Sequence, residues 1–116
     1  MEKTTRYGTI KISDNAFEKL IKDALLQTKG AESLAMEIRP IIIKEDEERI
    51  TLEFHVVHKF GTSMRHSAKT VMDYIEKNLK SIKLSKNVTI RMMIVAVKAR
   101  KTVKRDLEFA RIVRLR

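Results

Sequence analysis

The sequence predicts an α+β fold, a two-layer sandwich in which two helices cover one face of a four-stranded sheet in the order β-α-β-β-α-β. Three observations predict it. Polar and apolar residues alternate over short segments, which is typical of half-buried strands. Between these segments, apolar residues twice recur every three or four positions, as on one face of a helix. The 116 residues suffice for one core, so we expect a single domain over residues 1–97 and a basic amphipathic segment over residues 98–116.

The first strand is predicted at residues 7–12, where Ile10 and Ile12 fall on one face. The next residues have side-chain oxygens that can cap the N-terminus of a helix. They are followed by an apolar stripe formed by Phe17, Leu20, Ile21, Ala24 and Leu25. Gly30 predicts the end of this first helix, because glycine readily adopts the left-handed backbone that closes many helices. Residues 31–37 fit either a strand or a packed loop.

Two strands joined by a tight turn are predicted next. Residues 38–44 form a strand whose start lies at a sheet edge, since Pro40 cannot donate a backbone hydrogen bond. The acidic residues 45–48 predict a solvated hairpin turn, and they lack the alternating spacing and central glycine of a calcium-binding loop. The clearest two-residue period in the chain then marks a strand through Ile50, Leu52, Phe54 and Val56.

The second helix is predicted to be longer than the first. Gly61 ends the preceding strand, and Thr62 or Ser63 can begin the helix. Its apolar stripe comprises Met64, Ala68, Val71, Met72, Ile75, Leu79 and Ile82. Residues 88–97 alternate again and predict the last strand of the sheet.

The segment at residues 98–116 carries most of the positive charge. It has eight basic and two acidic residues, a net charge of +6 out of +10 for the whole chain. Apolar side chains lie among its cations, so we expect a basic helix, or an arm that becomes ordered on an acidic partner such as nucleic acid, anionic lipid or an acidic protein face. The alternative is that these apolar side chains pack on this domain or on a second copy of it. The expected partner-binding residues are Arg100, Lys101, Lys104, Arg105, Leu107, Phe109, Arg111, Ile112 and Arg114.

The sequence offers no set of residues to which catalytic roles can be assigned. It contains no cysteine, and none of its three glycines lies in a phosphate-binding loop. His55 and His58 are three apart on a strand and point to opposite faces, so scattered surface or boundary histidines are expected rather than a metal site. Ser63 is expected to cap a helix and Ser67 to face solvent beside His66. We therefore expect no enzyme activity, cofactor, metal or small-molecule substrate.

Three short segments resemble the alkaline-shock, envelope-stress-response family of small bacterial proteins. Residues 7–13, YGTIKIS, are similar to the opening strand of that family. Residues 55–61, HVVHKFG, and the helix at residues 64–71 resemble its apolar strand, aromatic-glycine turn and second helix. Residues 24–34 resemble the segment after its first helix through Thr28, Gly30 and Leu34. The resemblance spans residues 7–97, whereas the basic C-terminal segment departs from the acidic character often found in the family.

This resemblance implies a cytoplasmic scaffold or adaptor that joins an envelope-associated assembly, often through a small membrane-anchored partner. We therefore expect a non-catalytic protein that binds a protein partner or its own copies at the cytoplasmic side of the envelope, peripheral to the membrane. The polar residues 1–10 contain no apolar run of the kind found in signal peptides or membrane spans, which favours a cytoplasmic location. The alternative is a nucleic-acid-binding domain that uses the basic segment.

Overall fold

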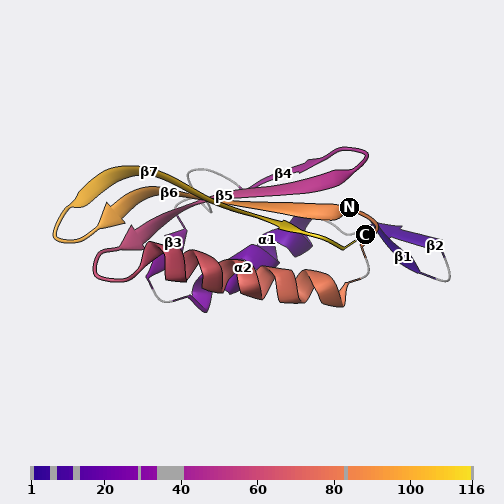
Figure 1. Ribbon diagram of the computed structural model, residues 1–116, viewed down its shortest axis with the longest axis horizontal. Coiled ribbons are helices and arrows are strands. Elements are labelled where there is room, and N and C mark those ends of the chain that lie inside the picture. The colour runs from indigo at the N-terminus through magenta and orange to yellow at the C-terminus, as the bar shows by residue number, and fades with distance from the viewer. Residues whose placement is uncertain are drawn as a thin grey trace.

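The computed structural model describes residues 2–5, 8–11, 14–28, 30–33, 41–82 and 84–115. It confirms the predicted α+β fold, because two helices lie on one face of a mixed sheet (Figure 1). The helices are α1 (Asp14–Leu26) and α2 (Met64–Ser81). The strands are β1 (Glu2–Thr5), β2 (Gly8–Lys11), β3 (Ala31–Ser33), β4 (Ile42–Glu45), β5 (Arg49–Lys59), β6 (Asn87–Lys98) and β7 (Thr102–Val113).

The main sheet is built around two parallel strands. β5 and β6 are neighbours in register from Arg49 opposite Asn87 to Lys59 opposite Lys98, and α2 is the crossover that parallel neighbours require. β7 returns antiparallel along β6. β3 and β4 both pair antiparallel with β5, β3 with its last part and β4 with its first part. The five strands therefore fill four positions, and β7 lies at one edge of the sheet.

The predicted first strand does not belong to the main sheet. β2 covers most of the predicted residues 7–12, but it pairs antiparallel with β1 in a separate two-stranded sheet. The two ends of that prediction, residues 7 and 12, lie outside the described residues. A two-residue period indicates a strand but not its partner, so it could not show which sheet the strand joins. The fourth position of the main sheet belongs to β7.

The prediction of a C-terminal helix or arm at residues 98–116 is wrong. The segment forms a hairpin with β6, and its strand β7 pairs with β6 from Lys98 opposite Thr102 to Val88 opposite Val113. Leu107 and Phe109 are half-buried against the core, and Val113 is 1% exposed. These three residues lie on one face at the even spacing of a strand, and burying them stabilises the strand over a helix that would leave part of them in water.

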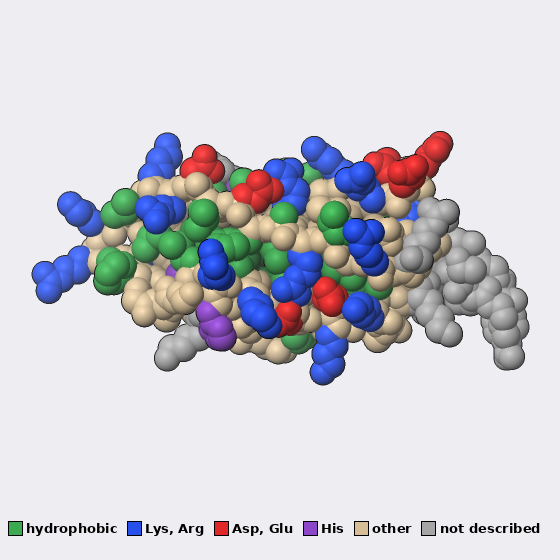
Figure 2. Space-filling model, in the orientation of Figure 1, with side chains coloured by type: hydrophobic (Ala, Val, Ile, Leu, Met, Phe, Trp, Pro, Cys, Tyr) green, Lys and Arg blue, Asp and Glu red, His purple; other side chains and the backbone are tan. Residues whose placement is uncertain are grey.

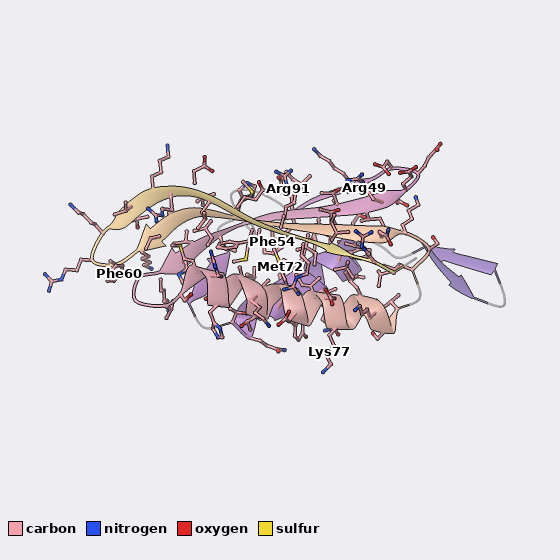
Figure 3. All side chains as sticks on the ribbon, viewed as in Figure 1. Arg49, Phe54, Phe60, Met72, Lys77 and Arg91 are labelled. Carbon is pink, nitrogen blue, oxygen red and sulfur yellow. The ribbon has the colours of Figure 1, made fainter. Side chains whose placement is uncertain are left out.

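The hydrophobic core lies between the sheet and both helices. Figure 3 shows Phe54 of β5 and Met72 of α2 between the two layers, and these side chains are 0% and 3% exposed. The residues that the alternation of β5 and β6 turns toward the helices are Ile50, Leu52, Phe54, Val56, Val88, Ile90, Met92 and Ile94. The helices contribute mainly Phe17, Ile21, Ala24, Leu25, Ala68, Val71, Met72, Ile75 and Leu79.

Local signals mark several boundaries where the sequence predicts them, although α1 ends at Leu26, four residues before Gly30. Ser63 caps α2, because its Oγ accepts a hydrogen bond of 3.2 Å from the backbone N–H of His66. The acidic residues 45–48 make the expected exposed turn between β4 and β5. Gly30 has a φ of +93°, and a Cβ atom there would lie 2.6 Å from Oγ1 of Thr62. Only glycine fits both this backbone and this close approach.

Candidate interaction surface

Five exposed cations gather where the hairpin between β6 and β7 projects at one end of the molecule. We call them the tip cations: Lys98, Arg100, Lys101, Lys104 and Arg105. Figure 2 shows blue side chains projecting at this left-hand end. Within the described part of the chain, no ion pair neutralises any of the five. The tip therefore concentrates positive charge that is available to a partner.

Apolar side chains lie beside these cations. Phe60 is 76% exposed and Val103 is 54% exposed, although both belong to side-chain types that are usually buried. Val97 is half-buried and lies directly opposite Val103 in the β6–β7 ladder. The backbone N–H of Phe60 donates a 2.8 Å hydrogen bond to the carbonyl of Lys98, which fixes the turn after β5 against the same end of the sheet. We call Phe60, Val97 and Val103 the tip apolar residues.

The predicted partner-binding residues do not all belong to this surface. Arg100, Lys101, Lys104 and Arg105 are tip cations, but Leu107 and Phe109 face the core. The sequence missed Lys98 and the tip apolar residues as site members. Only Phe60 had a signal in the sequence, because it is an aromatic residue directly before Gly61 at the end of a strongly periodic strand.

The remaining three predicted residues lie toward the C-terminal end of β7. Nη1 of Arg111 lies 2.7 Å from Oδ1 of Asp73 and 3.6 Å from Oε1 of Glu76, so it links β7 to α2. Ile112 and Arg114 are exposed. Because successive side chains of a strand alternate, Ile112 lies on the sheet face opposite to that of Arg111 and Val113. The predicted set is therefore divided between the tip, the core, an ion pair and the outer face of the sheet.

Several carboxylates have a lowered pKa because cations or backbone N–H groups stabilise their charged forms. Hydrogen bonds from Lys69 and then Arg111 lower the pKa of Asp73. A hydrogen bond from Arg91 lowers the pKa of Glu108. The backbone N–H groups of Arg49 and Glu48 lower the pKa of Asp46, whose Oδ1 accepts both hydrogen bonds at 2.8 Å. All three carboxylates strengthen the fold only while they are ionised.

Acid is therefore expected to destabilise the protein. A carboxyl whose pKa is lower in the folded state stabilises the fold fully above its unfolded pKa, and this contribution disappears as the pH falls through the folded pKa. The midpoint of urea unfolding should fall as the pH drops below about 4.5, where free carboxyls begin to protonate. The Asp46→Asn variant retains a side-chain oxygen acceptor but does not titrate, so its midpoint should depend less on pH. An equal acid dependence in both proteins would contradict this explanation.

A buried pair of polar side chains joins β5 to α2. His58 is 0% exposed and Ser67 is 3% exposed, so the prediction of a surface or boundary position is wrong for His58, and that of a solvent-facing Ser67 is wrong too. The half-buried His55 and the exposed His66 do match the prediction for histidines. Nε2 of His58 lies 2.8 Å from Oγ of Ser67, and Nδ1 lies 2.8 Å from the carbonyl oxygen of Lys59. That carbonyl can only accept, so Nδ1 donates to it. The pair therefore forms a buried polar link between the sheet and α2.

Two observations on the described residues concern metal binding and cavities. These residues contain no group of three or more His, Cys, Asp or Glu side chains placed to hold a metal ion. A small hollow between α1 and α2 is lined by Ala16, Phe17, Leu20, Asn78, Ser81 and Ile82. Its described lining has no acid, base or histidine, and the amide nitrogen of Asn78 already donates to the carbonyl of Tyr74. Neither α1 nor α2 is long and apolar enough to cross a bilayer.

No protein-family model, curated protein or solved structure matches the chain. The resemblance to the alkaline-shock family therefore stays a prediction that rests on the three quoted segments. Parts of two of those segments, at residues 7, 12–13, 29 and 34, lie outside the described residues. The third segment, at residues 55–61, forms the end of β5 and the turn into α2.

Proposed function

We propose that the protein is a non-catalytic scaffold of the envelope-stress-response type, which binds a protein partner or its own copies at the cytoplasmic side of the cell envelope. The observation that carries this proposal is the edge strand β7. β7 is 12 residues long, and within the described chain it pairs only with β6. One row of its backbone N–H and C=O groups therefore faces outward, ready to pair with a strand from another chain.

The side chains of β7 favour a selective partner over indiscriminate aggregation. Charged residues and bulges are the usual protection of edge strands. β7 carries Lys104, Arg105 and Arg111, and its register with β6 shifts between Ile94 and Ala96, where a bulge interrupts the pairing. The part of β7 that pairs regularly with β6, from Leu107 to Val113, presents Ala110 and Ile112 on the exposed face. A strand of another protein or of a second copy that places apolar side chains beside Ala110 and Ile112 complements this part of the edge.

Self-association tests the proposal directly. The wild-type protein should form dimers or larger species in sedimentation equilibrium as its concentration rises. The Ile112→Glu variant replaces an exposed apolar side chain near the β7 edge by a carboxylate, so it should weaken association about tenfold. Lys77→Glu, on the exposed side of α2, is the control and should leave association unchanged (Figure 3).

If the protein stays monomeric, the proposal requires that β7 binds a different protein. In that case the wild-type protein should retain an envelope protein in a pull-down, and Ile112→Glu should lose it while Lys77→Glu keeps it. A monomer whose captured proteins are the same for all three chains would contradict the proposal.

Nucleic-acid binding is the second candidate function, and the positive charge of the five tip cations favours it. It predicts an affinity that falls steeply with salt concentration. The aromatic side chains argue for placing it second. Phe17 and Phe54 are buried and Phe109 is half-buried, so the described phenylalanines leave only Phe60 open for stacking on a base.

A further inference from the structure

We propose that the tip docks directly on an anionic lipid bilayer, with the tip apolar residues entering the interface between water and lipid while the tip cations contact the phosphate headgroups. This proposal takes the envelope location from the proposed function. Lys104 and Arg105 belong to both the tip and the β7 edge, but the residues that test the tip, Phe60, Arg100 and Lys101, lie outside β7, so each proposal can fail without the other.

The shape of the tip suits a flat surface. The molecule is elongated, with extents of 54 × 24 × 20 Å, and the β6–β7 hairpin projects at one end of it (Figure 1). The turn from β5 into α2 reaches the same end, and Figure 3 shows Phe60 there. A projecting end can insert side chains into a headgroup layer, whereas a nucleic-acid strand is usually held along a groove or a platform.

The exposed apolar side chains favour lipid over nucleic acid. In the cross-strand register, His58, Val97 and Val103 lie in one row. Phe60 lies in the turn directly after β5, where its hydrogen bond to the carbonyl of Lys98 holds it at the same end of the sheet. An aliphatic Val103 that is 54% exposed has no stacking role on a base, but it gains from leaving water at a bilayer interface. The combination of aromatic, aliphatic and basic side chains is typical of interfacial membrane binding.

The charge distribution would also orient the protein on the membrane. The tip cations lie beside the end of β5, where Lys59 pairs with Lys98, while the acidic turn at residues 45–48 precedes the first residue of that strand. The two charged regions therefore lie at opposite ends of an 11-residue strand. Figure 2 shows red side chains at the upper right and blue side chains at the far left. A negative surface attracts the tip and repels the acidic turn, so we expect the tip to contact the membrane and the long axis of the molecule to point away from it.

Vesicle sedimentation tests the proposal. The full chain should bind vesicles that contain phosphatidylglycerol and should bind pure phosphatidylcholine vesicles far more weakly. Each Lys or Arg near an anionic surface strengthens binding by about fivefold, so replacing two cations in Arg100→Glu/Lys101→Glu should weaken binding by at least about 25-fold. Lys77→Glu makes the same kind of charge change on α2 and should alter binding by less than about threefold.

The contribution of Phe60 to membrane binding is tested by a measurement that does not depend on a change of charge. The chain has no tryptophan, so Phe60→Trp introduces a single fluorescent reporter at the tip. Its emission should shift to shorter wavelength on phosphatidylglycerol vesicles, and brominated lipid should quench it. Phe60→Ala should weaken vesicle binding by about tenfold without changing its salt dependence.

Three outcomes would overturn the proposal. The first is no binding to phosphatidylglycerol vesicles at low salt. The second is a loss of binding in Lys77→Glu as large as that in the double tip variant. The third is an unshifted Phe60→Trp emission together with tight binding to single-stranded DNA, which would assign the tip to nucleic acid. Ile112→Glu separates the two proposals, because it should keep vesicle binding while it weakens association through β7.

Discussion

A chain that ends at Val97 is expected to lose its fold. The truncation removes β7, and with it the ladder that pairs β6 from Val88 to Lys98. It also exposes the core surface that Val113 covers at 1% exposure and that Leu107 and Phe109 partly cover. The lost apolar burial alone is worth about 5 kcal/mol, which is comparable to the whole free energy of unfolding of a domain this size. Circular dichroism should show a large loss of structure and no cooperative thermal transition.

A chain that ends at Arg114 is the matched control. It keeps all of β7 and loses the half-buried Leu115, whose backbone N–H donates a 3.0 Å hydrogen bond to Oδ1 of Asn87. We expect this chain to unfold cooperatively at a moderately lower temperature. A cooperative transition of the chain that ends at Val97 would show that β7 is dispensable. If the chain that ends at Val97 is unfolded, a loss of binding by that chain gives no information about the tip. For this reason, point variants are used to test the interaction surface.

The strands and helices around the core were predictable because each has one face toward the core and another toward solvent, so apolar and polar residues recur at the period of the element. Burial alternates along β5 and β6 as the sequence alternates, and α2 ends at Ser81, one residue before the predicted stripe ends. Tertiary contacts decide an edge strand such as β7. Arg111 interrupts the apolar face of β7, yet it is the position that pairs with Asp73 on α2. That partner lies 38 positions away in the chain, and no local pattern indicates it.

The candidate interaction surface was predictable only in its charge. Arg100, Lys101, Lys104 and Arg105 stand out in the sequence because they are crowded together. Phe60 lies 40 or more positions before them, and only the parallel pairing of β5 with β6 brings it to the same end of the sheet. A local pattern likewise cannot show that His58 and Ser67 meet, since that contact requires α2 to fold back along β5.

Two phenylalanines of the same region should differ sharply in their effect on stability. Phe54 is 0% exposed in the middle of β5, between the sheet and α2, whereas Phe60 is 76% exposed directly after the strand. Phe54→Ala removes a large side chain and leaves a cavity that the packed layers can only partly fill. It should lower the free energy of unfolding by about 3–5 kcal/mol and the melting temperature by roughly 15 °C.

Phe60→Ala removes the same atoms from a side chain that water already surrounds. It should change the free energy of unfolding by no more than about 0.5 kcal/mol. Urea unfolding of both variants and the wild-type chain, monitored by circular dichroism, measures the difference. Comparable destabilisation by the two substitutions would mean that Phe60 packs into the fold, and the tip would then lose its most exposed apolar side chain as a docking group. A stable Phe60→Ala chain instead provides a folded protein in which any loss of vesicle binding belongs to the missing ring.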